Sequence, residues 1–240
     1  MSGESGDDER DESDATREQR RVRFGVLLGA VFAAFLISGI AEPGEAGQVS
    51  RLLLNGLTLV LALIAAEAPM RRVRRVAGAV VVLAVVGVLA SIIGHPDSTT
   101  GRGLDAVLLG CSIPVVIIGT IRNLNRSGTV TLEAVFGVLS VYVLFGMFFA
   151  ALFGFIAEIE GASVFGPNAA STVAHCIYYS FTTLTTIGYG DLTTKTNFTH
   201  TLSVSEALLG QIYLVTVVSL IVSNLGQSHS LRRGGKEPAA

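Results

Sequence analysis

Long apolar segments alternate with short polar ones along most of the chain. Six of these segments are long enough to cross a bilayer as helices, because about 20 residues rising 1.5 Å each span the hydrocarbon core. They cover residues 24–41, 51–70, 76–93, 104–121, 132–157 and 202–225. Pro114 is expected to bend the fourth of them. The pattern therefore predicts an all-α membrane protein with six transmembrane helices.

Composition supports the same class. The chain has 240 residues, of which 50% are hydrophobic and 15% charged, and its mean hydropathy is +0.59. A soluble domain of this size would be less apolar. Cys111 and Cys176 both lie in apolar segments, which favours packing roles over a disulfide or a metal site. His, Asp, Glu, Ser and Cys do not cluster at one membrane depth, so we expect no enzymatic activity, no cofactor and no nucleic-acid partner.

The charged residues predict the topology. Residues 1–23 are expected to form a disordered acidic cytoplasmic tail, because eight of the first 20 residues are Asp or Glu. A cleaved signal peptide is the alternative for the first apolar segment, but the long acidic stretch before it favours a retained helix. With an even number of crossings, 14 of the 17 Lys and Arg residues fall on one side. By the positive-inside rule both termini are then cytoplasmic in the cell membrane, and residues 227–240 are a short cytoplasmic tail.

A polar loop, Thr-Leu-Thr-Thr-Ile-Gly-Tyr-Gly-Asp at residues 183–191, interrupts the apolar pattern before the last segment. A desolvated cation needs a ring of oxygens in place of its hydration water, and several copies of an extended loop with inward carbonyls supply such rings. Turning consecutive carbonyls the same way needs backbone angles of alternating sign, which Gly188 and Gly190 adopt at low cost. Thr186 can add a ring of hydroxyls. The alternative is a Gly-rich turn between helices, but a polar loop at membrane depth must be buried or line an aqueous path.

The segments beside this loop predict the rest of a pore unit. Residues 169–184 form a helix too short to cross the bilayer, with Asn168 as its N-cap, which fits a re-entrant pore helix. The partial negative charge at its C-terminal end would favour a nearby cation. Residues 158–168 are expected to form an extracellular turret, whose Glu158 and Glu160 either concentrate cations or are merely solvated.

The last apolar segment contains two unusual residues. Gly210 weakens an apolar helix, so it is expected to serve as a gating hinge or a close contact between helices. Glu206 lies one turn earlier, and acids inside a span are functional candidates. It either hydrogen-bonds the back of the pore helix, which we favour, or faces the cavity as a cation attractor. The face expected to line an inner cavity carries Gln211, Leu214, Val218 and Val222.

Residues 132–225 resemble the pore domain of the potassium channel superfamily, in the order outer helix, pore helix, selectivity filter and inner helix. The loop differs from the TVGYG of such channels only by an isoleucine. The resemblance implies a homotetramer around one pore, because the chain carries one filter copy and four are needed. It implies that Thr186, Ile187, Gly188, Tyr189 and Gly190 form the ion-binding filter, with K⁺ held at the first four of them.

The same resemblance implies supporting roles around the filter. Tyr178 and Tyr179 match an aromatic pair that packs around the filter as a cuff. Thr185, which directly precedes the filter, supports it, and Asp191 shapes the outer mouth together with Gly190. Gly210 follows Asp191 at the spacing of the hinge glycine in two-transmembrane bacterial channels. Some relatives brace the aspartate with a glutamate on the pore helix, where this chain has Thr182.

The first four apolar segments resemble those of voltage-gated channels only in number. A voltage sensor needs arginines at every third position within one span, and residues 103–121 contain none. Arg71, Arg72, Arg74 and Arg75 cluster at a membrane edge and are interpreted as topology anchors. We therefore divide the chain into a four-helix membrane domain at 24–126 and a pore domain at 127–226.

The predicted function is passive, potassium-selective conduction through the TIGYG filter of a bacterial six-transmembrane channel without a standard voltage sensor. Its expected partners are potassium ions, membrane lipid and further copies of itself. A weakly selective cation channel is one alternative, which the intact Gly-Tyr-Gly-Asp disfavours. A non-conducting membrane sensory or scaffold subunit is another, and the small and aliphatic inner face favours conduction over it.

Overall fold

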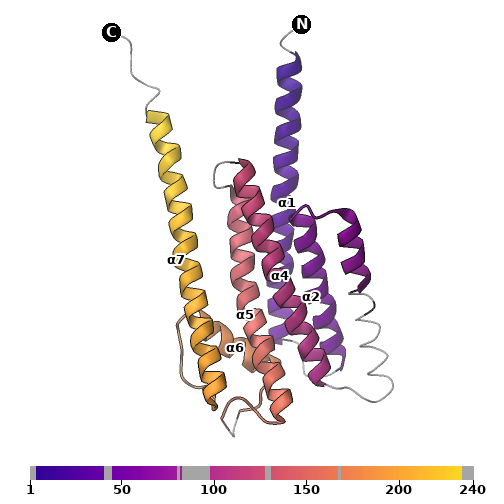
Figure 1. Ribbon diagram of the computed structural model, residues 1–240, viewed down its shortest axis with the longest axis vertical. Coiled ribbons are helices and arrows are strands. Elements are labelled where there is room, and N and C mark those ends of the chain that lie inside the picture. Colours follow the sequence, from indigo (N-terminus) through magenta and orange to yellow (C-terminus); the bar gives the residue numbers. More distant parts are fainter. Residues whose placement is uncertain are drawn as a thin grey trace.

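The computed structural model describes residues 4–40, 45–79, 82, 98–127, 131–166 and 169–233. Within these ranges the chain is helical and contains no β-strand, as the all-α prediction requires. The labelled helices are α1 (Glu4–Ile40), α2 (Glu45–Ala65), α4 (Ser98–Ser127), α5 (Leu132–Glu160), α6 (Val173–Leu184) and α7 (Asn197–Arg233) (Figure 1). Residues 70–79 form a further helix.

Four of the described helices are long and apolar enough to cross a membrane. These stretches are Arg21–Ile40, Gly47–Ala65, Gly101–Asn123 and Leu132–Glu160. They coincide with the first, second, fourth and fifth predicted spans. The third predicted span lies mostly outside the described residues, and the sixth falls within α7. The total of six spans stays a prediction.

The N-terminal tail differs from its expectation. Helix α1 begins at Glu4, so the residues from there to 23 are helical rather than disordered. The Glu, Arg and Ala residues of this segment are good helix formers, and no proline interrupts them. The polar segment therefore continues the spanning helix beyond its apolar part (Figure 1).

Helix α5 is the centre of the arrangement. It packs against α1, α4, α6 and α7, whereas α7 packs on α5 and α6. Helix α2 lies on the far side, against α1 and α4. The N-terminal end of α1 and the C-terminal end of α7 point to the same end of the molecule, and α6 lies toward the opposite end (Figure 1). The fold thus places the loop after α6 away from both described chain ends.

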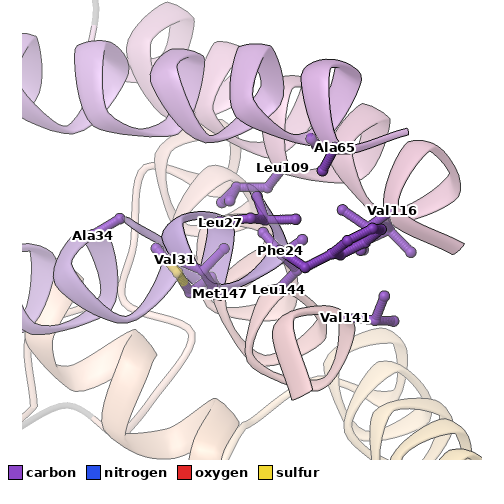
Figure 2. Close-up of a cluster of buried hydrophobic side chains, with 12 residues drawn as sticks. Phe24, Leu27, Val31, Ala34, Ala65, Leu109, Val116, Val141, Leu144 and Met147 are labelled. Atoms are coloured by element: carbon purple, nitrogen blue, oxygen red, sulfur yellow. The ribbon is translucent and has the colours of Figure 1, made fainter. Parts of the chain in front are cut away.

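The main apolar core joins α1, α2, α4 and α5 (Figure 2). Phe24, Leu27 and Val31 recur at helical spacing on one face of α1, and each is at most 1% exposed. They meet Leu144 and Met147 of α5. Because lipid tails are as apolar as these side chains, such packing is favoured mainly by close van der Waals contact. The core therefore fixes α5, on which α6 and the loop after it rest.

Candidate functional site

The loop after α6 has an alternating backbone. Thr186, Gly188 and Gly190 have φ of 59°, 51° and 79°, and the residues between them do not share this sign. Glycine adopts such angles at low cost, but a β-branched threonine does not, and strained residues of this kind cluster at functional sites. The backbone amide of Thr186 donates to the Thr183 carbonyl oxygen, and that of Gly188 to the Thr182 carbonyl oxygen, both at 3.0 Å. The positive angles at Gly188 and Gly190 are those that the sequence predicted, whereas the positive angle at Thr186 was not predicted.

A single copy of the chain leaves this loop uncovered. Every residue from 185 to 191 is exposed. Ile187 is 54% exposed and Tyr189 68%, although both are large apolar side chains. These two side chains are available for contact with other subunits.

Helix α6 ends directly at the loop. Its 12 residues extend roughly 18 Å, which is too short to cross a hydrocarbon core of about 30 Å. The helix begins at Val173 rather than at residue 169, because the hydroxyl oxygen of Thr172 caps it by accepting from the backbone amide of His175 at 3.1 Å. The predicted cap, Asn168, lies outside the described residues. The negative end of the helix dipole points toward the loop.

Tyr178 holds the outer part of the loop. Its hydroxyl donates to Asp191 Oδ2 at 3.0 Å. Its ring stacks on that of Tyr189, with centroids 6.1 Å apart and planes 5° apart. Thr182 instead donates to the carbonyl oxygen of Tyr179, so it does not brace the aspartate. The structure therefore places Tyr178, one member of the predicted cuff, in contact with the loop.

Tyr179 points into the protein. Its hydroxyl shares a hydrogen bond of 2.6 Å with Ser203 Oγ of α7, and its ring contacts Phe153 and Phe165, with both centroid distances 5.1 Å. The second member of the aromatic pair therefore joins α6 to α5 and α7. Thr185, also predicted to support the loop, donates to the carbonyl oxygen of Phe181 at 2.6 Å.

Glu206 lies behind α6, as the favoured interpretation predicted. The residue is fully buried, and its Oε1 is hydrogen-bonded to Ser180 Oγ. The same hydroxyl lies 2.7 Å from the carbonyl oxygen of Gly146 on α5. A serine hydroxyl carries one hydrogen and cannot donate to two acceptors at once. A protonated Glu206 supplies the second hydrogen, while its buried Oε2 has no hydrogen-bond partner in the described part of the protein.

Gly210 provides a close contact between α6 and α7. A Cβ atom at this position would lie 3.0 Å from the Leu184 carbonyl oxygen and 2.6 Å from Leu184 Cδ1. Helix α7 continues through Gly210 without interruption. The geometry supports the close-contact interpretation of this glycine, and the hinge stays a prediction. Of the predicted cavity-lining residues, Gln211 and Leu214 are exposed, while the side chains of Val218 and Val222 lie outside the described part.

Two tyrosines that the sequence analysis did not single out also support the base of the loop. The Tyr142 hydroxyl donates to the Leu184 carbonyl oxygen at 3.3 Å. The Tyr213 hydroxyl donates to the carbonyl oxygen of Val138 at 2.7 Å, and the two tyrosine rings stack with centroids 6.3 Å apart. Their signal in the sequence was a polar-tipped side chain inside each apolar segment.

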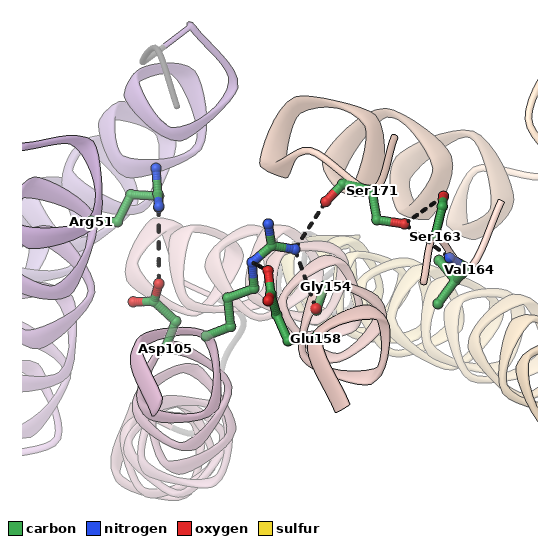
Figure 3. Close-up of polar contacts among 8 residues, drawn as sticks. Arg51, Asp105, Gly154, Glu158, Ser163, Val164 and Ser171 are labelled. Carbon is green, nitrogen blue, oxygen red and sulfur yellow. Dashed lines mark hydrogen bonds and ion pairs between the residues drawn. The ribbon is translucent and has the colours of Figure 1, made fainter. Parts of the chain in front are cut away.

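Arg102 connects α4 to the segment before α6 (Figure 3). Its Nη1 donates to the carbonyl oxygens of Gly154 and Ser171 at 3.2 and 2.9 Å, and its Nε lies 3.1 Å from Glu158 Oε1. A Cβ atom on Gly154 would lie 2.9 Å from Arg102 Nη1, so the glycine allows this approach. The pairing offsets the charge of Glu158, one of the two carboxylates considered as cation attractors. Among the described residues, no group of three or more His, Cys, Asp or Glu side chains is placed to hold a metal ion.

Comparison with known proteins gives one match to a protein family. No curated protein and no solved structure matches the chain at a significant level. Residues 137–227 match a family model described as an ion channel. The match covers most of α5, all of α6, the loop after it and most of α7. Over these residues the chain is therefore similar to ion channels, and four of its described helices are long and apolar enough to cross a membrane.

Proposed function

We propose that the protein is a potassium-selective channel in which Thr186-Ile187-Gly188-Tyr189-Gly190 is the selectivity filter. The observation that carries the proposal is the alternation of φ along the exposed loop at the end of α6. Such a backbone can present consecutive carbonyl oxygens on one side, where they replace the water that a potassium ion sheds. The ion passes down its electrochemical gradient, and the protein supplies oxygens, orientation and a water-filled path.

The proposed assembly is a homotetramer around one axis. One chain carries one copy of the loop, and a ring of oxygens around an ion needs several. The exposed side chains of Ile187 and Tyr189 support this assembly, since neighbouring subunits would cover them. The outer surfaces of the helices would contact membrane lipid.

The proposed orientation places both termini in the cytoplasm and the filter mouth outside. The charge distribution supports it, with 14 of 17 Lys and Arg residues on the inner side. The described ends of α1 and α7 also lie at one end of the molecule, opposite α6 (Figure 1). Gln211 and Leu214 are exposed on α7, and in this orientation they would face the inner cavity on the cytoplasmic side of the loop.

The test is a flux assay with purified protein in liposomes. Potassium or rubidium is expected to enter rapidly and sodium to be excluded, because the oxygen rings substitute for the hydration shell of the larger ions. Protein-free liposomes provide the background. Equal sodium and potassium flux would contradict the selectivity and favour a general cation channel. Absence of any flux at all membrane potentials and pH values tested would favour a silent subunit.

A further inference from the structure

A small cavity lies at the junction between the N-terminal helices and α6. Ser38 of α1, Arg51 and Asn55 of α2, and Asp105 of α4 contribute its polar wall. Residues of α5 and α6 close the other side, with Cys176 among them. The cavity has a volume of about 40 Å³. By that measure one water needs roughly 10–15 Å³, so there is room for more than one.

The polar wall is incomplete within the described part of the protein. Asn55 Nδ2 donates to Asp105 Oδ1 at 3.0 Å, but Asn55 Oδ1 has no hydrogen-bond partner. Arg51 Nε lies 4.0 Å from Asp105 Oδ2, which is too far for a hydrogen bond (Figure 3). Arg51 Nε and Nη1 and the Ser38 hydroxyl also have no partner. These residues are all more than nine-tenths buried. Two arginine nitrogens, a hydroxyl group and an amide oxygen therefore need hydrogen-bond partners from a molecule in the cavity.

The chemistry of the wall selects the occupant. It must accept hydrogen bonds from Arg51 and donate one to Asn55 Oδ1. An anion could do the first but not the second, and the Asp105 carboxylate would repel it. A cation would face the guanidinium groups of Arg51 and Arg102, which also lines the cavity. An apolar guest would satisfy none of the polar atoms.

We propose that the cavity is a hydration site in which buried water molecules complete the network of Ser38, Arg51, Asn55 and Asp105. Water both donates and accepts, and the space and the number of polar partners meet its needs. The water cluster links α1, α2 and α4 and lies against α6. This site is separate from the loop after α6 and does not depend on which ion the protein conducts.

The test uses hydroxyl radicals generated by brief X-ray irradiation of the full chain in lipid nanodiscs, followed by mass spectrometry. Radicals formed from internal water modify the side chains beside it, and sulfur atoms react readily. Met147 and Cys176 line the cavity and are 4% and 1% exposed. Both are expected to be labelled in the wild-type protein. Met70, which is 69% exposed, serves as the positive control.

A pair of variants assigns the labelling to the cavity. Ser38→Val removes the hydroxyl and fills space, so labelling of both sulfurs is expected to be lost. Thr58→Val is the matched control, because Thr58 is buried on α2 with its hydroxyl on the Leu54 carbonyl oxygen and does not line the cavity. It should keep the wild-type labelling.

Two results would overturn the proposal: no labelling of Met147 and Cys176 in the wild type while Met70 is labelled, or equal labelling in wild type and Ser38→Val. If Ser38→Val does not fold, a high-resolution map of the wild-type protein decides. Water density within hydrogen-bond distance of Ser38 Oγ and Asn55 Oδ1 is expected, and an empty cavity would contradict the proposal.

Discussion

Two regions of the molecule differ in how their buried polar side chains are hydrogen-bonded. In the pore region, formed by α5, α6 and α7, hydroxyl groups reach backbone carbonyl oxygens directly, as Tyr142 and Tyr213 do. In the region of α1, α2 and α4, the buried pair of Arg51 and Asp105 leaves several polar atoms without partners. Among the described residues, four buried side-chain polar atoms without partners belong to α1 and α2, and one, Glu206 Oε2, belongs to the pore region. The four gather in one site, which we propose water occupies.

The difference indicates what each region requires beyond its own residues. Direct hydrogen bonds fix the helices that carry the loop, whereas the loop itself is exposed, and we propose that further copies of the chain cover it. The N-terminal region packs its apolar core within one chain (Figure 2), and we propose that water completes its polar site. Four substitutions test which contacts hold the loop and the helices in place, from the largest expected effect to the smallest.

Gly188→Ala should abolish potassium flux. Gly188 has a φ of 51°, and an alanine in this left-handed region costs about 1–2 kcal/mol, in every subunit. The substituted loop is expected to turn its carbonyls and lose its ion sites. Liposome flux provides the measurement. Gly166→Ala is the control, because nothing lies within 4 Å of a Cβ atom at that position and its φ is not positive. Wild-type flux through the Gly188→Ala protein would refute the filter assignment.

Gly210→Ala should destabilise the packing of α7 on α6 by about 1–3 kcal/mol. The new Cβ atom would approach the Leu184 carbonyl oxygen to 3.0 Å, and a helix backbone cannot move aside as a flexible side chain can. Thermal unfolding of the assembled protein measures the loss. Gly29→Ala, at a helical glycine with open space around it, should be neutral or slightly stabilising. Equal effects of the two substitutions would show that the close contact is unimportant.

Glu206→Leu should destabilise the protein by about 1–3 kcal/mol, because it removes a buried hydrogen-bonding partner of Ser180. Glu206→Gln keeps the shape and supplies an N–H where the neutral carboxyl supplies an O–H, so it should be nearly wild type. Thermal unfolding and single-channel conductance distinguish them. If Gln is as harmful as Leu, the neutral-carboxyl interpretation is wrong.

Arg102→Met should have the smallest effect, a loss of about 1–2 kcal/mol, mostly from the two carbonyl hydrogen bonds. The ion pair with Glu158 is partly exposed, with side chains 21% and 25% accessible, so screening by solvent limits its share. Thermal unfolding measures the effect, and Arg71→Met, at an exposed arginine of the helix 70–79, is the matched control. No difference between them would show that the α4 contact does not stabilise the segment before α6.

Local patterns in the sequence were sufficient for part of the fold. The apolar segments matched four described helices, because burial in lipid acts on each segment by itself. The alternation of φ around Gly188 was predictable because it depends on residue types within one short loop. The cap of α6 was not, since several residues of the capping type precede this helix in the sequence, and the structure uses Thr172.

By itself the sequence determined the helical class, the apolar segments long enough to cross a membrane and the residue types of the loop, because each depends on neighbours along the chain. Only the tertiary structure decided which of two roles Glu206 takes, through a serine 26 positions away. It also placed the buried Arg51 beside Asp105, whose carboxylate accepts a hydrogen bond from Asn55. Contacts between distant segments form only when helices pack, and no periodicity within one helix encodes the partner on another.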